Sequence, residues 1–392
     1  MNLCADVLVF GAGVTGLSTA YWLCKKGKKV VLAEKAVMGA GASGACDDMI
    51  LFQSKKPGIL LKLAFKSLEL FRELEKDLPG DIELETRGGM IFIENDSQLK
   101  VMEEFVASQN KYGLNVEIVD KKQLRKLQPN ISDCVIASTY CSQDSQVNPM
   151  SLMKGYRLAA LSLGMKLLDR IYPVELNQNA SKWTAFLSDG TVVESEAIVN
   201  ATGAHANDVC ALAGINVPIT PRKGQVLVTE QLPRIGETNA WSALYITSKL
   251  KPELTDMSNP LAQKYGLGFA FSGTHNGNYL IGSTRENAGF DKTTIPEAIS
   301  LLGNQARHFF PVLGKAHIIR TFAGLRPSTP DGMPFVGEVP ALPGFYVAAG
   351  HEGDGIALSP VTGKVVADMI CGITPEFDIS ELKAGRFMGE KT

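Results

Sequence analysis

Three glycines and a glutamate near the start of the chain have the residue types and spacing that bind a dinucleotide. Gly11, Gly13 and Gly16 follow one apolar run, and Glu34 ends the next. Between a strand and a helix, the first glycine permits a tight turn, the second lets backbone approach a pyrophosphate, and the third lets the helix pack closely on the sheet. A carboxylate about 20 residues later can accept hydrogen bonds from a ribose diol and repels a 2′-phosphate. This motif leaves open whether the dinucleotide is FAD or NAD.

Two later segments offer further places where backbone could meet the same ligand. One buried apolar run ends at Ala201 and Gly203, and Gly353 and Gly355 precede a predicted helix from Ile356 to Cys371. The start of such a helix can stabilise negative charge on a bound ring, as a reduced flavin requires. Turn geometry alone also calls for glycine, but the three glycines in residues 350–355 exceed that need. The pattern therefore favours a role in binding the dinucleotide.

The elements that must position these residues alternate between helical and strand-like patterns. Apolar residues recur at helical spacing in four segments, 60–78, 99–112, 149–164 and 356–371. Strand-like runs dominate from Thr220 to Thr284, at 225–229, 243–247, 269–272 and 279–282, while 249–268 is typical of a long loop or insertion. This order predicts an α/β protein in which an antiparallel sheet domain is inserted into a Rossmann-like nucleotide domain.

The predicted domains are both discontinuous in sequence. We assign residues 1–88, 145–219 and 320–392 to the nucleotide domain. Residues 89–144 and 220–319 form the predicted substrate domain. A chain of 392 residues is long enough for two such domains.

Composition and charge exclude several classes of protein. The net charge is −2 with both signs interspersed, so neither nucleic acid nor an anionic membrane surface is an expected partner. The seven cysteines form no CxxC pair and the five histidines show no metal spacing, so we expect free thiols, no metal and a cytoplasmic location. No segment approaches the roughly 18 uncharged apolar residues of a membrane-spanning helix.

These motifs, taken together in one order, resemble the FAD-dependent amino-acid and amine oxidoreductases. That family includes D-amino-acid dehydrogenase, glycine oxidase, sarcosine oxidase and the flavin-bearing β-subunits of proline, hydroxyproline and opine dehydrogenases, to which this chain is most similar. Further motifs that carry the resemblance are Gly41–Gly44, Arg87–Gly89, Asp144 with Asn148–Pro149, Asn200–Ala204, Arg222–Gln225, Gly277–Asn278, Ile281–Glu286 and Gly324–Pro327. The resemblance selects FAD over NAD and implies a D-amino-acid-oxidase-like fold of the glutathione-reductase type.

The resemblance also implies roles for individual residues. The implied FAD contacts are Gly11, Gly13, Gly16, Glu34, Lys35, Ala42, Ser43, Val174, Ala201, Gly203, Gly353, Gly355 and Ile356. Arg326 resembles the guanidinium that binds a substrate carboxylate in two-pronged fashion, although a surface arginine or one stacked on the flavin edge is the alternative. Tyr245 and His275 fall on or beside strands that border the substrate in relatives, but packing or surface roles are the simpler interpretation.

Three departures from the family pattern bear on the subgroup. Where many relatives carry an asparagine and glycines against the flavin, this chain has Cys46, Asp47 and Asp48, and Cys46 is either a small core residue or a thiol beside the ring. The cysteine that attaches flavin in sarcosine oxidases has no counterpart near Gly324, so noncovalent FAD is expected. The lysine that promotes their reaction with oxygen corresponds to Leu280, which favours another electron acceptor.

The resulting hypothesis is an FAD-dependent dehydrogenase of a small amino or imino acid. The candidate substrates are a proline, a hydroxyproline, a D-amino acid, an N-alkyl amino acid or an opine. A neutral amine would bind, hydride would leave its Cα for flavin N5, and the imine would be released or hydrolysed. The alternatives are a hydrogen-peroxide-forming oxidase, and an FAD subunit that is active only with a partner electron-transfer subunit.

Overall fold

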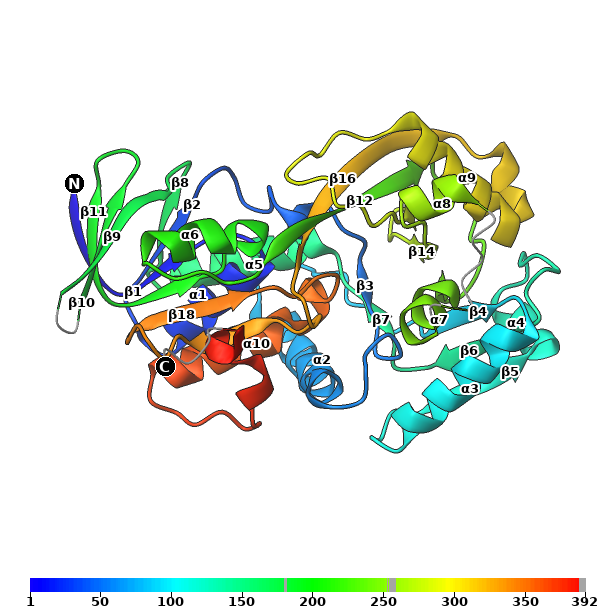
Figure 1. Ribbon diagram of the computed structural model, residues 1–392, viewed down its shortest axis with the longest axis horizontal. Helices are drawn as coiled ribbons and strands as arrows, with labels where there is room; N and C mark the ends of the chain where they lie inside the picture. The colour runs from blue at the N-terminus through cyan, green and yellow to red at the C-terminus, as the bar shows by residue number, and fades with distance from the viewer. Residues whose placement is uncertain (180–181, 252, 254–258, 388–392) are drawn as a thin grey trace.

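The computed structural model describes residues 1–179, 182–251, 253 and 259–387, and places two large sheets beside each other (Figure 1). The first sheet has the strand order β17-β18-β11-β1-β2-β8, with β10 and β9 added at β11. Its strands are β1 (Asn2–Phe10), β2 (Val30–Glu34), β8 (Lys166–Asp169), β9 (Pro173–Asn179), β10 (Lys182–Leu187), β11 (Val192–Asn200), β17 (Phe335–Glu338) and β18 (Phe345–Ala349). The strands β18, β11, β1, β2 and β8 are parallel, as a nucleotide-binding sheet requires.

Helices cover both faces of this sheet because its central strands are apolar on both sides. The helices of this domain are α1 (Val14–Lys25), α2 (Ile59–Asp77), α5 (Pro149–Ser162), α6 (Ala206–Leu212) and α10 (Gly355–Ile370). Val7 and Val9 point into a core shared with α1, α2, α5 and α10, whereas Leu8 and Phe10 point into a second core with α6 and β10. This alternation is the period of two that a strand imposes.

The second sheet is largely antiparallel and has the order β16-β12-β15-β14-β13-β4-β6-β5. Its strands are β4 (Gly89–Ile93), β5 (Val116–Asp120), β6 (Ala137–Cys141), β12 (Thr220–Thr229), β13 (Asn239–Ser242), β14 (Ala270–Gly273), β15 (Tyr279–Gly282) and β16 (Ile318–Ser328). The accompanying helices are α3 (Asp96–Asn110), α4 (Lys121–Leu127), α7 (Leu244–Leu250), α8 (Pro260–Lys264) and α9 (Pro296–Phe309). A small ribbon of β3 (Met49–Ile50) and β7 (Ser145–Gln146) lies apart from both sheets.

The long strands β12 and β16 connect the two domains. They pair along almost their whole length, from Thr220 opposite Ser328 to Thr229 opposite Ile318. Figure 1 shows the pair running from the first domain into the second. Because β16 is part of the second sheet, the domain boundary predicted at residue 320 falls inside this strand.

The predicted α/β fold with an inserted antiparallel sheet is confirmed, and one predicted strand is wrong. Residues 243–247 were expected to be strand-like, but Leu244–Leu250 is α7. Burial of Ile246 beside Trp241, and the hydrogen bond from Thr247 Oγ1 to the carbonyl of Ala243, favour the helix over the β-branched preference for a strand. The predicted loop 249–268 contains α8, and its residues 252 and 254–258 lie outside the described part.

No helix within the described ranges is both long enough and apolar enough to cross a membrane.

Candidate functional site

A cavity of about 650 Å³ lies where the carboxyl ends of β1, β2, β11 and β18 meet the β12–β16 pair. In a doubly wound sheet, ligands bind in the crevice at this end of the strands. The walls come from segments that are far apart in sequence, namely 10–15, 33–47, 171–173, 201–212, 224–226, 324–327 and 348–356. The volume and position of the cavity suit a ligand with several parts.

The N-terminus of α1 forms one end of the cavity. Gly11 has φ +102°, and a Cβ there would lie 2.6 Å from the carbonyl oxygen of Ala201, so only glycine fits this turn. A Cβ on Gly16 would lie 1.9 Å from the carbonyl oxygen of Gly11, which explains how closely α1 sits on the strand. The helix has no acidic residue in its first turn and no side-chain cap. Apart from the N–H of Val14, which donates to a side chain, the N–H groups at the start of α1 therefore offer an anion site that suits a pyrophosphate.

Two polar side chains complete this end of the cavity. The Ser43 hydroxyl accepts a hydrogen bond from the N–H of Val14 at 3.1 Å. The Glu34 carboxylate accepts one hydrogen bond from Ala12 N–H at 2.7 Å and another from Ala36 N–H at 2.8 Å. These contacts hold both oxygens of Glu34 at the rim, where the remaining lone pairs could accept a ribose diol.

The N-terminus of α10 forms the other end. Gly353, Gly355 and Ile356 line the cavity there, and the first turn of α10 contains no acidic residue. Asp354 precedes the helix and pairs with the fully buried Lys55 at 2.6 Å. The backbone of α10 therefore faces the cavity with its positive dipole end, and the flanking carboxylate is already neutralised.

Arg326 lies between the α10 end and the β12–β16 pair. Its Nη1 donates to the Thr284 carbonyl at 3.0 Å, and its Nη2 donates to the Ser283 hydroxyl at 2.7 Å. Burial, followed by the positive charge of Arg285, lowers the pKa of Arg326 to about 10, so the guanidinium stays charged at neutral pH. A Cβ on Gly224 would lie 2.1 Å from Arg326 Nη1, so Arg326 can lie across β12 only because residue 224 is glycine.

The segment 45–48 forms part of the wall beside Arg326. Ala45, Cys46 and Asp47 line the cavity, whereas Asp48 is buried behind them. Burial is the main cause that raises the pKa of the Cys46 thiol and of the Asp47 carboxyl, and it raises that of Asp48 to about 7. A Cβ on Gly324 would lie 2.3 Å from the carbonyl oxygen of Ala45, so backbone does approach closely at this departure from the family pattern.

Most of the residues singled out in the sequence come together at this cavity. Those that line it are Gly11, Gly13, Glu34, Lys35, Ala42, Ser43, Ala201, Gly203, Arg326, Gly353, Gly355 and Ile356. Gly16 lies beneath the turn rather than in the wall. Val174 is 49% exposed in β9, just beyond the wall residues 171–173. Tyr245 lies on α7, and its ring is 3.8 Å from the Arg285 guanidinium.

Sequence reasoning missed the Ser283 hydroxyl and the Thr284 carbonyl as the hydrogen-bond partners of Arg326. This segment was noted only as a family motif, and no spacing in the sequence assigns these residues a role. The structure places them against Arg326 because β15, which they follow, pairs with β12, and β12 pairs with the strand that carries Arg326.

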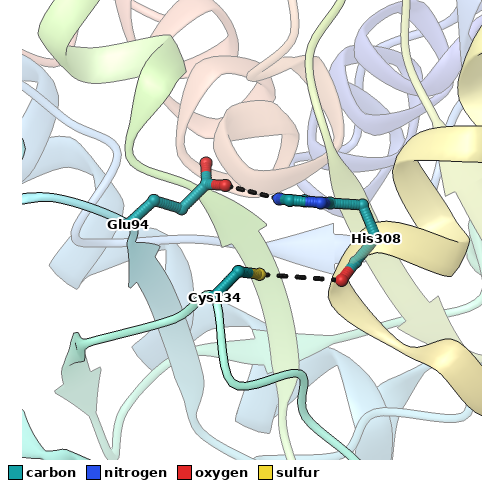
Figure 2. A group of neighbouring side chains, drawn as sticks. All are labelled: Glu94, Cys134 and His308. Atoms are coloured by element: carbon teal, nitrogen blue, oxygen red, sulfur yellow. Dashed lines mark hydrogen bonds and ion pairs between the residues drawn. The ribbon is translucent and has the colours of Figure 1, made fainter.

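Outside the cavity, three segments bring together possible metal ligands that the sequence spacing did not predict. Glu94, Cys134 and His308 each offer one donor atom, and these atoms lie within 4.8 Å of one another (Figure 2). Glu94 Oε1 is 2.6 Å from His308 Nε2, and the Cys134 thiol donates to the His308 carbonyl at 3.6 Å. Each donor atom also has a protein partner, and these contacts join the end of α9 to the segment that follows β4.

The chain is similar to known flavoproteins over its whole length. Residues 6–369 match the family described as FAD dependent oxidoreductase. The chain is 28% identical to the hydrogen cyanide synthase subunit HcnC of Pseudomonas aeruginosa, covering 100% of this chain and 98% of that one. It is also 28% identical to the glycine oxidase of Geobacillus kaustophilus, covering 98% of each.

Solved structures give the same result for the fold. The crystal structure of the Geobacillus kaustophilus glycine oxidase superposes with a TM-score of 0.88 at 26% identity, over 99% of this chain and 100% of that one. An L-proline dehydrogenase from P. horikoshii superposes with a TM-score of 0.88 at 23% identity, over 99% of each chain. At that identity the second likeness bears on the fold alone.

Proposed function

Because the chain belongs to the family of FAD-dependent oxidoreductases, we propose that it is a dehydrogenase that oxidises the Cα–N bond of a small amino or imino acid. One observation carries this proposal. The cavity that suits the cofactor holds a half-buried guanidinium, Arg326, beside the N-terminus of α10. Among the described residues, no carboxylate forms an ion pair with Arg326, so its charge is left to be matched by a ligand.

The cavity fits FAD at both ends. The open N-terminus of α1, with Ser43 and Glu34, would hold the adenosine diphosphate. The N-terminus of α10 would face the flavin ring and favour negative charge on it. When bound, FAD accepts the electron pair that leaves the substrate.

We propose that FAD is held without a covalent bond. Cys46 is the cysteine that lines the described cavity, and its pKa is raised by burial and by the nearby Asp47 and Asp48 charges. A thiol with a raised pKa stays protonated and is a poor nucleophile. Denaturation in acid should release all of the yellow colour into the supernatant, whereas colour that stays with the precipitate would contradict this part of the proposal.

Arg326 would fix the position and rotation of the substrate. A planar guanidinium can bind both oxygens of a carboxylate, which aims the substrate Cα–H toward one place. Its two hydrogen bonds to Ser283 and Thr284 hold it in one orientation before the substrate arrives. No general acid or base is needed to position the substrate in this way.

The proposal is tested by anaerobic flavin reduction. The purified yellow protein should bleach with at least one substrate from a panel of prolines, D-amino acids, N-methylglycine and opines, each tested as both enantiomers where they exist. Replacing Arg326 with Met should lower the second-order reduction rate by about 100-fold or more, since a desolvated charge pair is lost. Arg320→Met on the same strand is the control, because Arg320 is exposed.

Two results would contradict the proposal. Absence of bleaching with the entire panel would exclude this substrate class. An equal loss of rate in the Arg320 and Arg326 variants would show that Arg326 does not hold the substrate.

An oxidase is the second candidate, because the similar Geobacillus kaustophilus protein is named a glycine oxidase. We favour a dehydrogenase because Leu280 stands where the resemblance places an oxygen-promoting lysine. Steady oxygen uptake without an added electron acceptor would identify an oxidase. The similar HcnC protein is named a subunit, so purification from the native host should also test for a partner chain that raises activity.

A further inference from the structure

Three side chains of metal-binding types meet at the end of α9, away from the cavity. They are Glu94, Cys134 and His308, and their donor atoms lie within 4.8 Å of one another. Figure 2 shows the Glu94 carboxylate and the Cys134 sulfur directed toward His308. Within the described ranges, this is the one group of three or more possible metal ligands. The proposed oxidation does not use these residues, since all three lie outside the cavity wall.

The fold fixes the backbone that carries the three side chains. The Ile136 N–H donates to the Ile93 carbonyl at 2.9 Å, and the Ser132 N–H donates to the Phe309 carbonyl at 2.8 Å. In the core beneath, the centre of the Phe309 ring lies 5.6 Å from the centre of the Phe92 ring. Because the neighbours of all three ligands are held in this way, a bound ion would have to order only the ends of side chains.

The contacts within the cluster are ones that a metal ion can replace. Glu94 Oε1 is 2.6 Å from His308 Nε2, and the Cys134 thiol makes a long contact of 3.6 Å with the His308 carbonyl. Zinc binds oxygen, nitrogen and sulfur ligands at about 2.0 to 2.3 Å. The Glu94 and His308 side chains are 23% and 46% exposed, so they have room for the small rotations that bring the three donors to this distance. On binding, the thiol proton would pass to solvent and the imidazole would keep a single proton on Nδ1.

The charge and the donor chemistry of the cluster suit Zn²⁺. A thiolate and a carboxylate carry two negative charges and a neutral imidazole carries none, which balances a divalent cation. The nearby cations Lys121 and Arg125 already pair with Asp133, at 2.6 Å and 2.7 Å. Sulfur and imidazole ligands favour zinc over magnesium and calcium, which take oxygen ligands.

We propose that Glu94, Cys134 and His308 bind one Zn²⁺ ion, with water as the fourth ligand, and that this ion joins α9 to the second sheet. The ligands come from the segment after β4, the segment before β6 and the last turn of α9. A partly exposed ion with three protein ligands can exchange with solvent, so its occupancy follows the zinc that is available. The ion stabilises the second domain because the site exists only in the folded chain. This inference does not depend on the proposed oxidation.

The test is a metal titration of the FAD-loaded protein, with its thiols reduced and adventitious metals removed by a chelator. Co²⁺ serves as the first probe, because a tetrahedral cobalt site with a thiolate ligand absorbs at longer wavelengths than oxidised flavin. We expect this absorption to saturate at one Co²⁺ per chain and to disappear when one equivalent of Zn²⁺ is added. Competition with a chromophoric chelator then gives the dissociation constant of Zn²⁺.

Substitution of each ligand should weaken Zn²⁺ binding. Cys134→Ser and His308→Gln should each raise the dissociation constant by about 100-fold or more, since loss of even an indirect partner of a metal ligand costs about 10-fold to 100-fold. Cys134→Ser should also abolish the cobalt absorption. His317→Gln is the control, because His317 pairs with Glu230 at 2.8 Å but belongs to no three-ligand group of the described residues.

A second control and a second readout separate the ion from other effects. Cys371→Ser removes a partly buried thiol outside the cluster and should leave the dissociation constant unchanged. Zn²⁺ at 100 times its dissociation constant should raise the melting temperature of the wild type by about 2 °C or more. The same Zn²⁺ concentration should not raise the melting temperature of Cys134→Ser.

Three results would overturn the inference. The first is a wild-type protein that gives no cobalt absorption. The second is cobalt absorption that persists in Cys134→Ser, and the third is an equal loss of affinity in the His308 and His317 variants, either of which would mean adventitious binding elsewhere. If Cys134→Ser does not fold, the wild-type titration and His308→Gln decide the matter. Flavin bleaching by amino acids, whether seen or not, leaves this inference standing.

Discussion

Gly224 controls the position of Arg326 although it carries no functional group. The guanidinium lies where a side chain on residue 224 would be, with 2.1 Å between the Cβ position and Arg326 Nη1. The atoms in the way are the end of a long, flexible side chain, whereas a backbone clash would disturb the fold. Gly224 thus affects substrate binding more than stability.

We therefore predict that Gly224→Ala displaces Arg326 and weakens substrate binding by about 10-fold to 100-fold, through the misplacement of an orienting group. The free energy of unfolding should change by less than about 1 kcal/mol. Anaerobic titration of flavin reduction measures the first effect and urea unfolding the second. Unchanged substrate affinity would show that Arg326 does not need the position seen here.

The buried side chain of His351 makes the free energy of unfolding fall in acid. This side chain is buried, its Nε2 is 3.0 Å from the Thr362 hydroxyl, and burial lowers its pKa to about 4. In the unfolded chain the pKa is near 6.5, so between these values the unfolded state binds more protons than the folded state. The contribution of neutral His351 to the free energy of unfolding is present above pH 6.5 and is lost as the pH falls toward 4.

We predict that His351→Gln removes about 3 kcal/mol of the difference in unfolding free energy between pH 7 and pH 4. The raised pKa values of Asp48 and Asp144 act in the opposite direction, so the slope of the variant must be compared with that of the wild type. Urea unfolding across this pH range is the measurement, and the exposed His275→Gln is the control. If the unfolding free energies of wild type and His351→Gln change with pH in parallel, the pH dependence does not come from His351.

At the scale of elements, α1 and α10 approach unusually closely. A Cβ on Gly363 in α10 would lie 2.3 Å from Ser18 Oγ and 2.7 Å from the backbone of α1. The Ser18 hydroxyl also donates to the Ser359 carbonyl at 2.9 Å, which ties the two helices together. Both helices begin at the cavity, so their packing sets the distance between its two ends.

Two alanine substitutions in helices should act in opposite directions. Gly363→Ala should cost about 1–3 kcal/mol of stability because it forces α1 and α10 apart. Gly303→Ala in α9, where a Cβ meets nothing within 4 Å, should stabilise the protein by about 0.5–1 kcal/mol through helix propensity. Urea unfolding measures the stability of both variants. Equal changes in the free energy of unfolding would contradict the inference that Gly363 is needed for the close packing of α1 and α10.

Elements with a local signal could be predicted from the sequence. The glycine spacing at Gly11, Gly13 and Gly16 is a local motif and the helix 59–77 has a clear apolar stripe, so both could be predicted from spacing, although the close contact of Gly11 with Ala201 is seen only in the structure. The helix at Leu244–Leu250 could not be predicted, because residues from distant segments bury Ile246 and override the strand preference. The contacts of Arg326 with Ser283 and Thr284 likewise depend on the pairing of β12 with β15 and β16, which no local pattern contains.

At the scale of the whole molecule, the cavity unites segments from the beginning, middle and end of the chain. Residues 10–15, 201–205 and 348–356 all line it. A ligand that touches all three segments binds only the folded chain, and it adds stability that grows with the logarithm of its concentration.

We predict that removing FAD lowers the melting temperature and that adding it back at 100 times its dissociation constant restores about 2.7 kcal/mol of stability. ADP, which reaches only the α1 end, should restore less at the same free concentration. Differential scanning calorimetry with each ligand makes the comparison. Equal effects of FAD and ADP would argue against contacts between the flavin and the α10 end.

The parallel pairing of β18 with β11 has a consequence for biosynthesis. Strand β18 and helix α10 are made long after α1 and Glu34, yet they complete the sheet and one end of the cavity. While the ribosome is still adding these residues, α1 and Glu34 are already outside it but face an incomplete wall. The vitamin-derived cofactor should therefore be captured only after α10 has left the ribosome, and a stalled or clipped chain that lacks α10 should be colourless.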